Sequence, residues 1–134
     1  MSINKYLMES EDEALRLELK TDIEVVKRQA KWAGIEPGMR IADIGCGPGI
    51  TTNALHSLSH PNGKTVGIDF SKPRIKYARE HYLSEGIEYV LKDIRNPLDG
   101  LGLFDVVWVR FVLEYYLKDS FEIVKNLLNI IFFA

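Results

Sequence analysis

A chain of 134 residues is long enough to bury the core of one domain. Its formal net charge of −2, with 46% hydrophobic residues, argues against a binder of nucleic-acid backbones, which normally carries a basic face. The single cysteine, Cys46, excludes an internal disulfide, no apolar run approaches the ~20 residues needed to span a membrane, and the amino terminus lacks a signal-peptide core. We therefore expect a cytoplasmic protein with neither nucleic-acid nor membrane partners.

The amino-terminal part of the chain predicts a helical region over residues 9–34. Apolar residues recur there at steps of three and four, which places them on one face: Leu15, Leu19, Ile23, Val26, Ala30 and Ala33. Thr21 and Asp22 can divide this region into two helices, with Asp22 near the start of the second. Gly34 and the following Pro37-Gly38 turn are typical of a helix end.

From Met39 onward, short apolar runs alternate with helical patterns. The runs predict strands at residues 39–44, 65–68, 87–91 and 104–109. Helices are predicted after the first two strands, the second of them with Ser71 as its N-cap, and again over residues 120–131. This alternation predicts a parallel sheet with right-handed crossovers, and the fourth run, apolar on both faces, is typical of a covered central strand.

A glycine-rich turn follows the first predicted strand. Asp43 ends the apolar run, and Gly45, Gly47 and Gly49 come at every second position before the helix. Such turns between strand and helix build nucleotide sites in parallel sheets. The dinucleotide fingerprint needs its third glycine where Ile50 stands, and a P-loop needs a Gly-Lys-Ser/Thr ending that is missing here. The spacing therefore disfavours a nicotinamide-dependent oxidoreductase, which stays as an alternative.

The pattern D-x-G-x-G-x-G resembles motif I of the class I S-adenosylmethionine-dependent methyltransferases. Three later stretches resemble further motifs of that family in the right order, so that the likeness covers residues 39–116: Gly67-Ile-Asp-Phe-Ser71, Lys92-Asp-Ile94 and residues 104–116. The resemblance implies an α/β fold with a Rossmann-like, mostly parallel sheet of strand order 3-2-1-4, flanking helices and an amino-terminal helical lid. It also implies S-adenosylmethionine as the cofactor.

The resemblance assigns roles to individual residues around that cofactor. Asp43 would approach the methionine part, while loop N–H groups bind the ligand near the helix start. Asp69, twenty residues beyond Gly49, would accept hydrogen bonds from both ribose hydroxyls, and Phe70 would lie against the adenine. Asp93 would accept from the adenine amino group, and the next N–H would read a ring nitrogen. The expected cofactor-binding set is Asp43, Gly45, Cys46, Gly47, Gly49, Asp69, Phe70, Asp93, Ile94 and Arg110.

Two of the reactive residue types carry no expected chemistry. Cys46 fits best as a small residue tolerated between two glycines. The three histidines, His56, His60 and His81, are scattered and expected to be solvated, so no metal site is predicted. Tyr89 and Trp108 are expected in the core.

The methyl acceptor is left open by the resemblance. Transfer from the sulfonium is an in-line displacement, in which the protein supplies alignment and exclusion of water, and a base is needed only where the acceptor must lose a proton. No Asn/Asp-Pro-Pro-Tyr run follows the fourth strand, which argues against methylation of a base nitrogen and favours a small-molecule acceptor. Acceptor-side candidates are Tyr6, Arg110, Glu114 and Tyr115, each of which has a purely structural role as an equal alternative.

One partial domain is expected over residues 1–134, with a lid region at 1–34 and the cofactor-binding core at 35–134. The family sheet has seven strands in the order 3-2-1-4-5-7-6, and this chain supplies the first four. We therefore expect a truncated or frame-shifted chain covering about the amino-terminal half of the family fold. Strand 104–109 would then be an unpaired apolar edge and residues 130–133 would lack cover, which predicts a twofold dimer. A non-catalytic cofactor-binding or interaction module is the alternative function.

Overall fold

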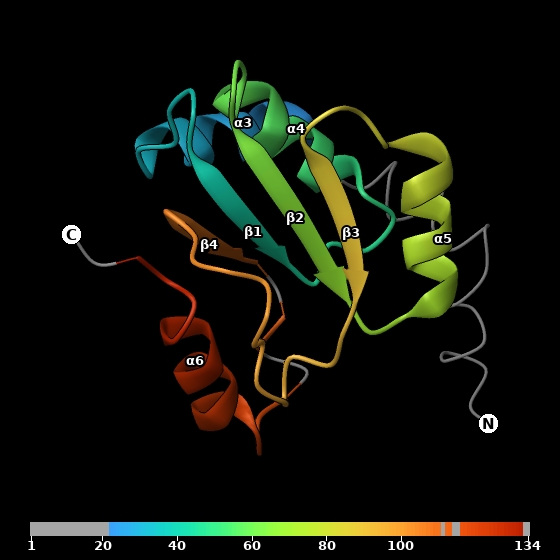
Figure 1. Cartoon of the computed structure of the whole chain (residues 1–134), viewed down its shortest axis with the longest axis vertical. Helices are drawn as coiled ribbons and strands as arrows, with labels where there is room; N and C mark the ends of the chain where they lie inside the picture. The colour runs from blue at the N-terminus through green and yellow to red at the C-terminus, as the bar shows by residue number, and fades with distance from the viewer. Residues whose placement is uncertain (1–21, 111, 114–115, 133–134) are drawn as a thin grey trace.

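A four-stranded parallel sheet lies at the centre of the computed structural model, which describes residues 22–110, 112–113 and 116–132 (Figure 1). Its strands, in chain order, are β1 (Arg40–Ile44), β2 (Lys64–Asp69), β3 (Ile87–Leu91) and β4 (Val106–Val109). They pair in the order β3-β2-β1-β4, and all three pairings are parallel. The predicted strand order is confirmed.

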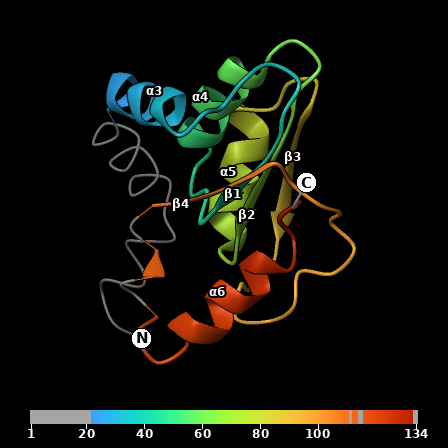
Figure 2. The ribbon, with the colours of Figure 1, turned by 90° about the vertical axis from the view of Figure 1, so that its left-hand side faces the viewer.

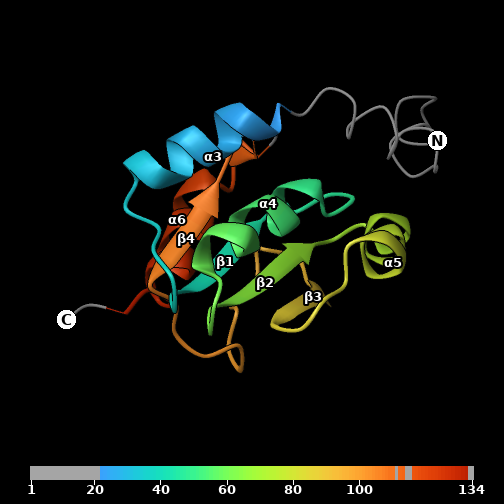
Figure 3. The ribbon, with the colours of Figure 1, turned by 90° about the horizontal axis from the view of Figure 1, so that it is seen from above.

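Helices cover both faces of this sheet. The described helices are α3 (Ile23–Trp32), α4 (Ile50–Ser59), α5 (Lys72–His81) and α6 (Ser120–Leu128). Ile41 of β1 packs with α3 and α4, which lie side by side in Figure 3, whereas its neighbour Ala42 packs with Ile123 of α6. Because successive side chains of a strand point to opposite faces, α6 lies on the other side of the sheet from α3 and α4, as Figure 2 also shows.

Two of the helices begin where side-chain capping predicts. The carboxylate of Asp22 accepts hydrogen bonds from the backbone N–H groups of Glu24 and Val25, at 3.1 and 3.2 Å. Ser71 accepts from the N–H of Arg74 at 3.4 Å and begins α5. Both side chains satisfy backbone donors that have no partner within the first helical turn, which is why the sequence locates these starts well.

The carboxyl-terminal part of the chain differs from the prediction. Helix α6 ends at Leu128, three residues early, and Ile131 instead forms a parallel bridge with Phe104. The N–H of Phe104 donates to the carbonyl of Ile130 at 2.7 Å, and the N–H of Phe132 donates back to the carbonyl of Phe104 at 2.8 Å. Ile130 is buried in the core under α6, so the expectation that it lacks cover was wrong. Strand 104–109 was expected to be an unpaired edge, but its first residue, Phe104, is paired with Ile131.

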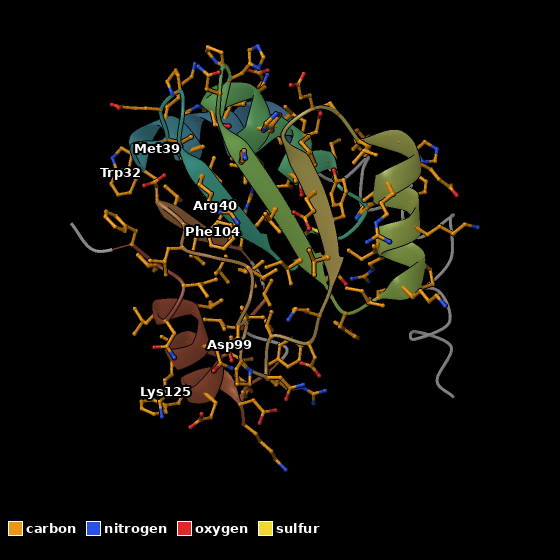
Figure 4. The ribbon with its side chains drawn as sticks, in the orientation of Figure 1. Trp32, Met39, Arg40, Asp99, Phe104 and Lys125 are labelled. Atoms are coloured by element: carbon orange, nitrogen blue, oxygen red, sulfur yellow. The ribbon has the colours of Figure 1, made fainter. Side chains whose placement is uncertain are left out.

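The start of β4 is fixed to β1 through Arg40. Its guanidinium carbon lies 4.5 Å from the ring centroid of Phe104, its Nη2 donates to the carbonyl of Leu101, and Figure 4 shows the two labelled side chains together. The backbone N–H of Arg40 donates to the carboxylate of Asp105 at 2.8 Å. These contacts set the position of β4 beside β1. They therefore also set the position of the carboxyl end of β4 at the edge of the sheet.

His56 is buried, which corrects the expectation that it is solvated. Its Nε2 lies 2.9 Å from the carbonyl oxygen of Glu85 and its Nδ1 lies 3.0 Å from the hydroxyl of Thr65. A carbonyl can only accept, so Nε2 donates to Glu85, and Nδ1 shares a hydrogen bond with the hydroxyl of Thr65. His60 and His81 are exposed, as expected.

The described residues contain neither a candidate membrane-spanning helix nor a candidate metal-binding group. None of the helices there is both long and apolar enough to cross a membrane. No group of three or more His, Cys, Asp or Glu side chains is placed there to hold a metal ion.

Candidate functional site

The polar residues singled out in the sequence lie at the carboxyl ends of the strands. The glycine turn follows β1, Asp69 is the last residue of β2, Asp93 comes two residues after β3, and Arg110 directly follows β4. Because the strands are parallel, these ends meet at one edge of the sheet (Figure 1). This is the edge at which open α/β sheets bind their ligands.

The glycine turn is held tightly against its neighbours and is open on one side. At Gly49 the backbone has φ of +100°, and a Cβ there would lie 2.9 Å from both the Cβ of Ala78 and the hydroxyl of Tyr89. Glycine is therefore required for α4 to begin this close to β3 and α5. A Cβ at Gly47, in contrast, would have no atom of the described residues within 4 Å, although Gly47 itself is buried. Among the described residues, the turn thus borders open space at Gly47.

Asp69 ties this turn to the start of α5. Its side chain is buried, with Oδ2 accepting from the N–H of Gly47 and Oδ1 accepting from the N–H of Ser71, both at 2.9 Å. A carboxylate oxygen has two acceptor positions, so each oxygen keeps one position for a further donor. Asp69 can therefore still accept from two neighbouring hydroxyl groups. The sequence predicted the residue but gave no sign of its bonds to the two loops.

Asp43 is a buried carboxyl with a neutral partner. Its Oδ2 accepts from the hydroxyl of Thr52 at 2.7 Å, and the residue is 2% exposed. Burial raises the pKa of Asp43 from 3.8 to about 7; the nearby charge of Asp69 also raises it, and the Thr52 hydrogen bond opposes the shift. A cationic group placed beside Asp43 would favour its ionised form. Thr52 was not singled out in the sequence, although a hydroxyl in the first turn after a glycine loop is a usable signal.

The edge near β3 carries four side chains that we call the Asp93 cluster: Phe70, Asp93, Arg95 and Tyr116. Arg95 bonds the carboxylate of Asp93, with Nη2 at 2.6 Å from Oδ2, and these hydrogen bonds lower the pKa of Asp93. The guanidinium carbon of Arg95 lies 5.8 Å from the ring centroid of Tyr116, and that ring meets the exposed Phe70 edge-on at 6.5 Å. Arg95 was missed because an exposed turn residue leaves no periodic signal, and the contacts of Tyr116 were missed because they join segments distant in sequence.

The remaining predicted residues have mixed placements. The pKa of the Cys46 thiol is raised mainly by burial and further by the charges of Asp43 and Asp69. A raised thiol pKa agrees with the expectation that Cys46 is a small, unreactive residue in the turn. The side chain of Ile94 is in the core and its carbonyl accepts from Asn126 at 3.1 Å, so only its N–H is left for the expected role. Tyr89 is buried as expected, whereas Trp108 is half-buried. Outside the described residues lie three of the acceptor-side candidates: Tyr6, Glu114 and Tyr115.

Comparison with known proteins identifies the family of this domain. Residues 41–131 match the family described as "Methyltransferase domain". The chain belongs to this methyltransferase family. The ubiquinone biosynthesis O-methyltransferase of Nitrosococcus oceani is 36% identical over 96 residues, which cover 69% of this chain and 38% of that protein. The juvenile hormone acid O-methyltransferase of Bombyx mori is 31% identical over 104 residues, or 75% and 36% of the two chains.

A solved structure shows the same fold. The magnesium protoporphyrin IX methyltransferase of Synechocystis PCC 6803, determined with bound S-adenosylmethionine, superposes with a TM-score of 0.65 at 20% identity, covering 81% of this chain and 52% of that one. These findings confirm the predicted Rossmann-like fold and the membership of the chain in the methyltransferase family. This methyltransferase chain spans little more than a third of the two curated relatives, 38% and 36% of their lengths.

Proposed function

We propose that this chain binds S-adenosylmethionine at the carboxyl edge of its sheet and takes part in methyl transfer to a small-molecule acceptor. The observation that carries the proposal is the environment of Asp69. Its buried carboxylate keeps one acceptor position on each oxygen, and it borders the open space at Gly47. A buried carboxylate with two spare acceptor positions suits the hydroxyl pair of a ribose.

The other described residues suit the remaining parts of the cofactor. Asp43 would face the cationic methionine end, and a positive ligand there would hold its carboxyl in the ionised form. The exposed ring of Phe70 would lie against the adenine, and Asp93 would accept from the adenine amino group. When bound, the cofactor supplies an activated methyl group on a sulfonium. The protein then has to align the acceptor and exclude water, and it needs a base only where the acceptor must lose a proton.

For the acceptor side of the site, we keep the four residues named from the sequence as candidates. Arg110 is half-buried at the end of β4, while Tyr6, Glu114 and Tyr115 lie outside the described residues. Residues 1–34 remain our proposed lid region, and the helix α3 within it packs on α4 and the core. We also propose a cytoplasmic location without nucleic-acid partners, supported by the net charge of −2 and the unpaired Cys46.

Calorimetry with S-adenosylhomocysteine, the demethylated cofactor, tests the binding proposal. We expect the wild-type chain to bind and Asp69→Ala to lose about 100-fold in affinity or more, because two hydrogen bonds to a charged group are removed. Asp99→Ala is the matched control, since that aspartate is exposed in the loop between β3 and β4. No binding by the wild-type chain would refute the proposal, and a preference for NAD would favour the oxidoreductase alternative.

A second measurement distinguishes a lost ribose contact from unfolding of the Asp69→Ala variant. A 2′-deoxy analogue of S-adenosylhomocysteine removes one ribose hydroxyl and leaves the protein unchanged. We expect it to bind the wild-type chain about tenfold more weakly, and Asp69→Ala to show no such difference. A screen of small-molecule acceptors with methyl-labelled S-adenosylmethionine then separates methyl transfer from a non-catalytic binding module.

We also propose that the chain forms a twofold dimer through the outer side of β4 and helix α6. Helix α6 and the turn before it expose an apolar stripe at helical spacing: Leu117, Phe121, Val124 and Leu128. Both signs of charge flank this stripe, in Lys118 and Glu122, so two antiparallel copies can be complementary. Within the described residues, β4 pairs on its outer side only next to its start, through Phe104. A monodisperse monomer in light scattering would contradict the dimer.

A further inference from the structure

The carboxylate of Asp93 is almost filled by donors from a single neighbour. The backbone N–H of Arg95 donates to Oδ1 at 3.0 Å, Nε lies 3.0 and 3.1 Å from Oδ1 and Oδ2, and Nη2 donates to Oδ2 at 2.6 Å. A carboxylate offers about four acceptor positions. Three N–H groups therefore leave about one position, in a direction that the planar guanidinium fixes.

The pairing of Arg95 with Asp93 contributes little to the stability of the fold. The Arg95 and Asp93 side chains are 51% and 30% exposed, and ion pairs this exposed contribute little to stability. The guanidinium is also held on a second side by the ring of Tyr116, which in turn contacts Phe70. Arg95 thus connects the carboxylate after β3 with the aromatic side chain after β2. Those two residues are the ones proposed to meet the adenine.

We propose that Arg95 is a positioning residue that orients Asp93, so that the one remaining acceptor position of the carboxylate selects a ligand base with an exocyclic amino group. This inference rests on the proposed function, which places the adenine between Phe70 and Asp93. An amino group donates to the free position. An oxo group at the same place is itself an acceptor and meets a carboxylate oxygen without a proton between them, so the base that carries it is rejected.

The test compares two ligands that differ only at this group. S-adenosylhomocysteine carries the amino group, and its inosine counterpart carries an oxygen. We expect the wild-type chain to prefer the adenosine ligand by about 10- to 100-fold in calorimetry, the range for a hydrogen bond to a charged group. In Arg95→Ala the ratio should fall to about threefold or less, mainly through weaker binding of the adenosine ligand. Arg95→Lys keeps the positive charge without the planar fork and should recover only part of the ratio.

Arg28→Ala, which removes an exposed arginine from α3, is the control and should keep the wild-type ratio. Thermal unfolding without ligand should give closely similar midpoints for all four proteins, because the pair is exposed. If the wild-type chain binds S-adenosylhomocysteine but Arg95→Ala keeps the full ratio, or binds the adenosine ligand more tightly, the role of Arg95 is refuted while the proposed function stands. If the wild-type chain binds S-adenosylhomocysteine and its inosine counterpart equally well, the role of Arg95 is also refuted while the proposed function stands. Failure of the wild-type chain to bind S-adenosylhomocysteine refutes both.

Discussion

The hydroxyl of Thr52 donates a hydrogen bond to the carboxyl of Asp43 inside the protein, at a distance of 2.7 Å. Both residues are buried, and the nearby charge of Asp69, which also raises the pKa of Asp43, is negative. A neutral hydroxyl offsets only part of the free energy lost when a carboxylate is removed from water. Asp43 therefore carries a proton in the folded state over a pH range in which an exposed aspartate has released it.

This arrangement predicts how stability depends on pH. Between about pH 4 and pH 7 the folded protein holds a proton on Asp43 that the unfolded chain has lost, so the free energy of unfolding should fall as the pH rises through this window. Asp43→Asn should remove that fall and be more stable than the wild-type chain at pH 8, by on the order of 3 kcal/mol. Urea unfolding of both proteins at pH 5 and pH 8 measures the difference. An identical pH dependence in the two proteins would contradict the raised pKa.

A second prediction separates backbone strain from crowding in the glycine turn. Gly34 and Gly49 have similar φ angles, +93° and +100°. Among the described residues, a Cβ at Gly34 meets nothing within 4 Å, whereas one at Gly49 meets Ala78 and Tyr89. Gly34→Ala should lower the free energy of unfolding by about 1–2 kcal/mol, the cost of a left-handed alanine. Gly49→Ala should lower it by about 2 kcal/mol more, since the methyl group also overpacks the contact.

Chemical denaturation of the two glycine variants measures this difference directly. The Gly49 variant should also bind S-adenosylhomocysteine more weakly, because α4 has to shift away from β3. Equal destabilisation by both substitutions would mean that α4 moves aside freely, and the tight start of α4 would then have no energetic role.

A third prediction concerns self-association. Phe121 is 78% exposed in the apolar stripe of α6, and Phe121→Lys should convert the proposed dimer into a monomer. Trp32→Lys is the matched control: it removes an even more exposed aromatic residue from α3, which Figure 4 shows far from Lys125 of α6. Light scattering at several concentrations gives the mass of each protein. Dissociation caused equally by both substitutions would place the contact elsewhere.

The sequence was most informative where local chemistry decides the structure. Asp22 and Ser71 cap their helices through bonds to residues two or three positions away, so both starts could be predicted. The end of α6 could not. Ile130 and Ile131 continue the apolar spacing of the helix, yet the chain becomes extended there because Phe104, distant in sequence, offers backbone groups for pairing. A periodic pattern contains no information about such a partner.

The same distinction applies to the candidate site. Asp43 and Asp69 were predictable because each lies at or near the carboxyl end of a strand and has a recognisable neighbour in the sequence. Arg95 was not, because its role depends on how a turn folds back toward Asp93 and Tyr116. His56 was mispredicted for a related reason: the carbonyl of Glu85 and the hydroxyl of Thr65 that bury and bond it come from other segments.

The two backbone hydrogen bonds of Asp69 have a consequence for how a ligand would bind. They hold the glycine turn and the start of α5 in place through bonds within the protein itself. A flexible turn would lose conformational entropy when it closed on a ligand, at about 1–2 kcal/mol for each residue ordered. Here most of that entropy is already lost when the domain folds, so it does not oppose association. The affinity of the site then reflects the contacts themselves, and substitutions that loosen the turn should weaken binding mainly through entropy.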